Sequence, residues 1–346
     1  MINRINIWQP FELKETTSPG VRIGDVVHVG AAFTPVGQPV TVALCKKADV
    51  WQGTVGESTV AVSLVDSKSA LDRIDQQQPQ GRVLLVGVGS GGSQISKWLA
   101  TSGAIKRMDL VDRDHLEVEN LSRHLCGASD VGRSKVLAVT DRLRSFLPNT
   151  EIHPHHMDII SDLKGFRTLA KKADIVICGT DSAVSRRIVS TVCRALKKPV
   201  LFPRCNARAS GGDVFVQSAN AGSPCLECWV NKLPQSETRI PQEELAAYAN
   251  DKAPALPGLA LDIAPIAHWC GRLALNALSC APTDSGLWIW SNRPEGGTSS
   301  WRLADASPNG LTTARWYHVH IQKDLSCPSC AEQAFIQEIK RELLCP

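Results

Sequence analysis

The chain has 346 residues, of which 43% are hydrophobic and 21% are charged. This composition is that of a globular protein and excludes intrinsic disorder as the main state. No apolar stretch approaches the roughly 20 residues of a membrane span, and the N-terminus has no signal-peptide pattern, so we expect a soluble cytoplasmic protein without a membrane partner. The formal net charge of +4 includes no Lys/Arg block, and no nucleic-acid partner is expected.

The chain contains 12 cysteines. A disulfide framework is typical of short secreted proteins, whereas this chain is long and shows no export signal. We therefore expect its cysteines to be metal ligands, nucleophiles or buried thiols.

Short β-type runs separated by turn residues occupy residues 21–66, as in VRIGDVVHVG and STVAVSLV. They predict a small β-rich N-terminal domain over residues 1–75. The polar stretch DQQQPQG at 75–81 has the composition of a linker. The main domain is expected over residues 81–346.

From residue 81 onward, apolar strand patterns such as RVLLVGV and DIVICGT alternate with amphipathic helix patterns. Nearly continuous apolar strands are typical of sheets that helices cover on both faces, so the sequence predicts an α/β, Rossmann-like, mostly parallel sheet. Residues 235–257 read as a long connection, followed by a helix at 259–278 and late strands at 286–292 and 316–321.

A glycine-rich segment, GVGSGG at residues 87–92, lies between the first strand and the first helix of the main domain. Gly87, Gly89 and Gly92 let the backbone turn tightly and approach phosphates at the helix N-terminus. Asp112 ends the next strand, where a carboxylate can accept a ribose hydroxyl. The segment predicts a nucleotide site and, taken alone, would also suit a dinucleotide oxidoreductase.

Polar and basic residues directly after Asp112 argue against an oxidoreductase. Arg123 and Lys135 can hold the β- and γ-phosphates of ATP and stabilise departing pyrophosphate, and Asn120 can orient a phosphate oxygen or Arg123 itself. Nicotinamide chemistry does not need this set. The sequence therefore predicts ATP as the nucleotide, and the alternative for these residues is a solvated charged loop.

The strand pattern DIVIC at 174–178 is followed by GTDS, which brings Asp181 to the edge of the sheet where ligands gather. We expect Asp181 to hold a magnesium ion on the phosphates. The alternative is that Asp181 caps the following helix.

Two C-x-x-C pairs stand far apart in the chain. Four thiolates suffice for a closed tetrahedral structural zinc site, and two such pairs favour metal over a redox-active role. The predicted ligands are Cys225, Cys228, Cys327 and Cys330.

As an ordered set, GVGSGG, LVDRD, EVENLSR, DVGRSK, GTDS, PCLEC and CPSC resemble the ubiquitin-activating enzyme superfamily, including its bacterial members that adenylate ubiquitin-like or sulfur-carrier proteins. The resemblance runs from about Gly81 to Cys330. It implies the same ATP, Mg²⁺ and Zn²⁺ residues, a symmetric homodimer, and a further arginine lent across the dimer, for which Arg73 is the candidate. By analogy, the N-terminal domain would grip the substrate or its conjugation partner.

The expected reaction is attack of a C-terminal carboxylate on the α-phosphate of ATP, with release of pyrophosphate. The expected substrate is a ubiquitin-like protein, whose activated form would pass to a conjugating enzyme if a thioester follows. Alternatives are a peptide-modifying adenylating enzyme of the microcin-maturing type, a sulfur-carrier adenylating enzyme without a thioester, an NAD-dependent oxidoreductase and a catalytically silent scaffold.

The nucleophile of such a thioester is the remaining question. Related enzymes place a cysteine in the crossing connection, but YANDKAPALPGLAL contains none. Cys205 follows the strand PVLFP between Arg204 and Asn206, and it is our candidate because these surroundings favour a thiolate. The alternatives are that Cys205 is a buried small residue lining the pocket, or that another of the 12 cysteines is the nucleophile.

Overall fold

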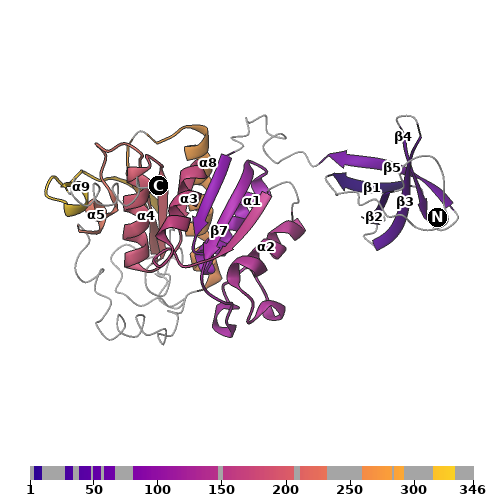
Figure 1. Cartoon of the computed structure of the whole chain (residues 1–346), viewed down its shortest axis with the longest axis horizontal. Helices are drawn as coiled ribbons and strands as arrows, with labels where there is room; N and C mark the ends of the chain where they lie inside the picture. The colour runs from indigo at the N-terminus through magenta and orange to yellow at the C-terminus, as the bar shows by residue number, and fades with distance from the viewer. Residues whose placement is uncertain are drawn as a thin grey trace, which may run out of the picture. The chain divides into compact units, whose positions relative to one another are not determined.

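The computed structural model divides into two compact units, Met1–Asp75 and Gln76–Pro346, and each is described by itself (Figure 1). In the first unit the structure describes the backbone of residues 4–9, 28–33, 39–47, 50–55 and 58–66. In the second it describes residues 81–146, 151–205, 211–231, 259–282, 284–291 and 315–331. Arg73 and the connection at 235–257 lie outside these ranges.

The first unit is a closed barrel whose strands follow chain order. Valine and threonine are frequent in its longer strands and favour extended backbone. An up-and-down order of five strands closes with a parallel pair, and β1 accordingly runs parallel to β5 with Ile5 opposite Val62. The strands are β1 (Arg4–Gln9), β2 (His28–Phe33), β3 (Pro39–Lys47), β4 (Val50–Val55) and β5 (Ser58–Asp66).

The second unit contains an 8-stranded sheet in the order β13-β12-β11-β10-β9-β6-β7-β8. The strands from β10 to β8 are mutually parallel, and β11, β12 and β13 add antiparallel pairs at the other end. The strands are β6 (Gly81–Val86), β7 (Ile105–Asp112), β8 (Glu151–His156), β9 (Ile175–Cys178), β10 (Val200–Cys205), β11 (Gly211–Gln217), β12 (Gly286–Ser291) and β13 (Arg315–His320). A mostly parallel α/β sheet is confirmed.

The helices of the second unit connect or flank these strands (Figure 1). They are α1 (Ser90–Ser102), α2 (Lys135–Phe146), α3 (Leu163–Lys172), α4 (Ala183–Ala195), α5 (Leu226–Val230), α8 (Ala260–Ser279) and α9 (Pro328–Ala331), with one-turn helices η2 (Val118–Asn120) and η3 (Ala128–Asp130).

Two hydrophobic cores lie on the two faces of this sheet, because successive strand residues point to opposite faces. Val83 and Leu85 of β6 pack with α1, α2 and α8 in one core. Leu84 and Val86 pack with α3, α4 and α5 in the other. This double coverage explains the continuous apolar strands, and it leaves the carboxyl ends of the parallel strands as the edge where polar residues can gather.

Long apolar helices of the length needed to cross a bilayer are absent from the described residues.

Candidate functional site

The glycine-rich loop joins β6 to α1 at the carboxyl edge of the sheet. Gly87 has a φ of +88°, and a Cβ there would lie 2.9 Å from the backbone N of Thr180. A Cβ on Gly92 would overlap with the carbonyl oxygen of Gly87. Gly89 differs, since a Cβ on it would meet no atom within 4 Å. This open space lies at the N-terminus of α1, where N–H groups and the helix dipole favour a phosphate.

Asp112 ends β7, the strand beside β6. Its two carboxylate oxygens accept the backbone N–H groups of Val88 at 2.8 Å and Asp114 at 2.9 Å. Burial raises the pKa of Asp112, although these hydrogen bonds and the nearby Lys135 favour the carboxylate. Asp112 therefore holds the glycine-rich loop in place, and each oxygen keeps a lone pair that can accept a ribose hydroxyl.

Arg123 reaches the same loop from the turn that follows η2. Its Nε donates to the Ser90 hydroxyl at 2.8 Å, which brings the guanidinium to the N-terminus of α1. Asn120 shapes this turn, because its side-chain oxygen accepts the N–H of Glu117 at 3.1 Å and its carbonyl accepts the N–H of Arg123 at 3.0 Å. Asn120 thus shapes the backbone of the turn that bears Arg123, and its expected contact with a phosphate oxygen or the Arg123 guanidinium stays a prediction.

Lys135 begins α2, and its partner Asp114 is the residue whose N–H binds Asp112. Its ammonium group forms an ion pair with Asp114 at 2.9 Å, and its side chain is 11% exposed. A nucleotide triphosphate would offer Lys135 a more highly charged partner than one carboxylate.

Asp181 follows β9, which pairs with β6 on the side opposite β7. Gly179 donates its N–H to the carbonyl of Val86 at 2.7 Å, so this segment lies against the glycine-rich loop. The expected alternative, that Asp181 caps α4, is wrong, because the cap is Ser182, whose hydroxyl accepts the N–H of Ser185 at 3.3 Å. Asp181 is exposed and its carboxylate is available to bind a cation.

Cys205 is the last residue of β10. Although the residue is exposed, burial of the thiol raises the pKa of Cys205 to about 12, Asp213 acts in the same direction and Arg186 opposes it. The expectation that Arg204 favours a thiolate here is therefore wrong, because burial disfavours the charged form and the Arg204 guanidinium binds Asp213 at 2.9 Å; Asn206 lies outside the described residues. Arg186 also donates to the carbonyl of Thr180 at 2.7 Å and to that of Pro203, which ties the end of β10 to the segment before Asp181.

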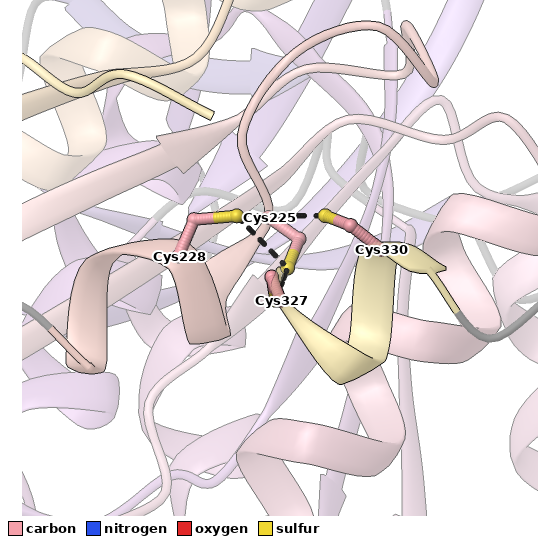
Figure 2. A group of neighbouring side chains, drawn as sticks. All are labelled: Cys225, Cys228, Cys327 and Cys330. Atoms are coloured by element: carbon pink, nitrogen blue, oxygen red, sulfur yellow. Dashed lines mark hydrogen bonds between the residues drawn. The ribbon is translucent and has the colours of Figure 1, made fainter. Parts of the chain in front are cut away.

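The four predicted zinc ligands converge from two distant segments (Figure 2). The Cys225 sulfur lies 3.8 Å from that of Cys228 and 3.7 Å from that of Cys327, and the Cys228 and Cys330 sulfurs are 3.4 Å apart. Tetrahedral zinc with Zn–S bonds of about 2.3 Å needs sulfurs about 3.8 Å apart. All four sulfurs lie within 4.8 Å of one another, so the cluster fits a closed zinc site and leaves no position for substrate.

Two residues of the site were missed by sequence reasoning. Ser90 is a hydrogen-bond partner of Arg123, and His124 contacts the carbonyl of Val88 at 2.8 Å. Ser90 stands inside the glycine-rich motif and His124 directly after Arg123, so proximity to motif residues was the available signal. Their partners lie 33 and 36 positions away, and sequence spacing alone does not give such contacts.

The glycine-rich loop, the acidic strand end and the basic turn lie together at the carboxyl edge of a mostly parallel α/β sheet, the place where such sheets bind ligands. The chain belongs to the ThiF family, which it matches over residues 60–283.

Similar curated proteins are named adenylyltransferases. The chain is 34% identical over 157 residues to the adenylyltransferase and sulfurtransferase MOCS3 of Aedes aegypti, over 45% of this chain and 35% of that protein. It is 30% identical over 148 residues to the molybdopterin-synthase adenylyltransferase of Escherichia coli, over 42% of this chain and 57% of that protein. The matches thus span about a third to somewhat over half of these relatives.

Solved structures share the fold at low sequence identity. E. coli MccB, crystallised with MccA-N7isoASN, has a TM-score of 0.55 at 15% identity, over 73% of this chain and 68% of that chain. PaaA has a TM-score of 0.53 at 16% identity, over 71% and 74%. These likenesses support the Rossmann-like assignment.

Proposed function

We propose that the chain is an ATP-dependent adenylyltransferase that activates the C-terminal carboxylate of a ubiquitin-like or sulfur-carrier protein. The observation that carries this proposal is the convergence of the glycine-rich loop, Asp112, Arg123 and Lys135 at one edge of a ThiF-family sheet. The names of the relatives support the reaction class.

In the proposed reaction, a carboxylate oxygen attacks the α-phosphorus of ATP. A carboxyl O–P bond forms, the bond from the α-phosphorus to the bridging oxygen breaks, and pyrophosphate leaves with the electron pair. Asp112 orients the ribose, while Arg123 and Lys135 neutralise charge on the departing phosphates. Asp181 would hold Mg²⁺, which supplies further neutralisation of the phosphates. Positioning and electrostatics thus account for the catalysis.

Further parts of the proposal concern assembly. The four cysteines would bind one structural Zn²⁺, and the family resemblance favours a homodimer in the cytoplasm, where ATP is available. The β-barrel unit at 1–75 would bind the substrate protein or a conjugating enzyme, and the unit at 81–346 would carry the chemistry. Light scattering at micromolar concentration tests the dimer, and a monomer would reject it.

Pyrophosphate exchange tests the activity. With Mg-ATP and its cognate partner, the protein should incorporate labelled pyrophosphate into ATP, and Asp181→Ala or Arg123→Ala should lower exchange by orders of magnitude. Arg142→Ala removes an exposed arginine from the outer face of α2 and is the matched control. Full exchange by Asp181→Ala would remove the magnesium assignment. Binding of NADH without ATP would reject the whole proposal, and exchange with peptides alone would favour a peptide-modifying enzyme.

A further inference from the structure

His124 lies between the nucleotide loop and the arginine turn. It directly follows Arg123 and is 8% exposed. Its Nε2 is 2.8 Å from the carbonyl oxygen of Val88, and its Nδ1 is 3.1 Å from the backbone nitrogen of Cys126. Both ring nitrogens are therefore used inside the protein.

The two partners determine which ring nitrogen carries the proton. A backbone N–H can only donate, so Nδ1 accepts from Cys126 and carries no hydrogen. A carbonyl oxygen can only accept, so Nε2 must carry the hydrogen that Val88 receives. These partners assign His124 as the neutral Nε2–H tautomer.

Neighbouring contacts join the same two segments. Arg123 donates to the Ser90 hydroxyl at 2.8 Å, and the N–H of Leu125 donates to the Ser93 hydroxyl at 3.3 Å. Ser90 and Ser93 belong to the first turn of α1, while Val88 belongs to the loop before it. Of these three side-chain contacts, the one from His124 is the only one that holds the loop backbone itself.

We propose that His124 is a positioning residue, which as the neutral Nε2–H tautomer fastens the glycine-rich loop to the turn bearing Arg123, and whose protonation weakens nucleotide binding. The nucleotide part of this inference rests on the proposed adenylyltransferase function. The loop contact itself does not.

Protonation opposes this geometry because it adds a hydrogen to Nδ1, which then faces the N–H of Cys126. One hydrogen bond is lost and two donors confront each other inside the protein. The charged groups around the ring act on the same equilibrium: Lys135 at the start of α2 and Arg123 on the adjoining turn disfavour the imidazolium, and Asp130 of η3 favours it. Burial is the largest influence on this equilibrium and outweighs the hydrogen bond to Val88, which favours the imidazolium, so the pKa of His124 is lowered below 6.5.

The sign of the pH dependence follows from this shift. Above pH 6.5 the imidazole is neutral in the folded and unfolded states, so the contact is fully present. As the pH falls below 6.5, the unfolded chain takes up a proton that the folded chain resists, and the stabilisation is lost as the pH approaches the folded pKa. Below the folded pKa the imidazolium still presents Nε2–H to Val88, but its Nδ1–H faces the N–H of Cys126, so the ring loses the contact that orients it toward the loop.

Calorimetric titration of the whole protein with Mg-ATP between pH 5 and 8 tests the functional part. Wild type should bind progressively more weakly below the titration midpoint of His124, by several-fold in total, because the protonated ring loses the Cys126 contact and keeps the Val88 contact. His124→Gln keeps a donor and an acceptor without titrating, so it should bind with a smaller acid loss, and His124→Leu should bind weakly at every pH. His153→Gln removes a half-exposed imidazole on β8 and should behave as wild type.

The comparison with His124→Gln also removes the contribution of ATP protonation, which is common to all variants. An acid loss of equal size in wild type and His124→Gln would overturn the functional part of the proposal. Wild-type affinity in a folded His124→Leu protein would overturn it as well.

Nitrogen NMR of histidine-labelled protein without nucleotide provides a separate readout. Spectra should show His124 as the Nε2–H tautomer with a midpoint below 6.5. A Nδ1–H tautomer would reject the loop contact, and a midpoint above 6.5 would reject the proposed pH dependence. If wild type binds no ATP at any pH, the adenylyltransferase proposal and the nucleotide part fall, while these spectra still decide whether His124 holds the loop.

Discussion

Asp112 accepts the backbone N–H of Val88 at 2.8 Å, so the end of β7 is fastened to the nucleotide loop that follows β6. The same carboxylate accepts the N–H of Asp114, whose own side chain holds Lys135. Loop, acid and lysine therefore form one connected unit, in which a change at Asp112 would disturb both the proposed ribose site and the proposed phosphate site.

Asp112→Ala should destabilise the protein by about 1–3 kcal/mol, because the buried N–H of Val88 loses its acceptor. Asp112→Asn keeps one acceptor oxygen and should lose less. Urea denaturation of both variants measures the effect. Wild-type stability in Asp112→Ala would show that the loop does not depend on this carboxylate.

Substitution by alanine should have different effects at two glycines of the same loop, lowering stability at one and ATP binding at the other. Gly92→Ala places a Cβ against the carbonyl of Gly87 and should cost about 1–3 kcal/mol or more of stability. Gly89→Ala places it in open space, so the protein should keep its stability while ATP binding weakens, because the methyl group occupies the expected phosphate position. Thermal melts and ATP titration of both variants test this pair. Equal losses of stability would contradict it.

A buried ion pair on β7 predicts acid sensitivity. Burial disfavours the charged form of Asp109, but hydrogen bonds from Arg107 and His155 prevail and lower the pKa of Asp109 below 3.8. A lowered carboxyl pKa stabilises the fold above pH 3.8, and this contribution is lost as the pH falls from 3.8 through the folded pKa.

Asp109→Asn should therefore cost about 1.5–3 kcal/mol at pH 7 and progressively less below pH 3.8. Asp141→Asn, at an exposed ion pair with Arg133, is the control and should leave the stability nearly unchanged. Guanidinium denaturation across the pH range compares the two variants. A difference between wild type and Asp109→Asn that stays constant with pH would contradict the lowered pKa.

Most of the α/β framework could be predicted from sequence because its signals are local. The continuous apolar run of β6 indicates that helices cover both faces of the sheet. The glycines after it indicate a tight turn, and neither inference depends on contacts with distant segments. Asp112 ends β7 and Asp181 follows shortly after β9, so the parallel order of the strands brings both to one edge.

The remaining features depend on contacts between distant segments. The surroundings of Cys205 could not be predicted from its neighbours in sequence. Arg204 binds Asp213 on β11, and the Cys205 thiol is shielded from water, which disfavours the thiolate. The role of Ser182 as the cap of α4 also needed backbone geometry, since Asp181 and Ser182 are both residues that cap helices.

The cysteine cluster should contain one zinc per chain by elemental analysis of protein purified without chelator. Cys228→Ser should lower zinc content and destabilise the fold, since structural zinc contributes folding free energy directly. Protein that is folded and contains no zinc would contradict this prediction.

Arg194 of α4 should support the same cluster. This arginine is 8% exposed and donates to the carbonyls of Ala221 and Ser223. These hydrogen bonds fix the position of the segment that leads to Cys225. Arg194→Met should release zinc to a chelator several-fold faster than wild type. The control is Arg187→Gln, whose exposed arginine binds Glu227 between the first two cysteines and should leave the rate nearly unchanged. Equal release rates for the two variants would show that the buried arginine does not support the site.

Cys205 remains our candidate nucleophile, and its raised pKa means that the thiol must be activated before it can attack. A thiol with a pKa of about 12 is almost entirely protonated at neutral pH, so attack on an adenylate requires that substrate binding bring a base or cation close to it. If Cys205 forms a thioester, Cys205→Ala should keep pyrophosphate exchange and lose a thiol-sensitive covalent adduct with the substrate on non-reducing gels. The buried Cys270 on α8 provides the control variant Cys270→Ala, which should retain the adduct. An adduct that survives in Cys205→Ala would reject this residue, and no adduct in wild type would mean that the adenylate itself is the product handed over.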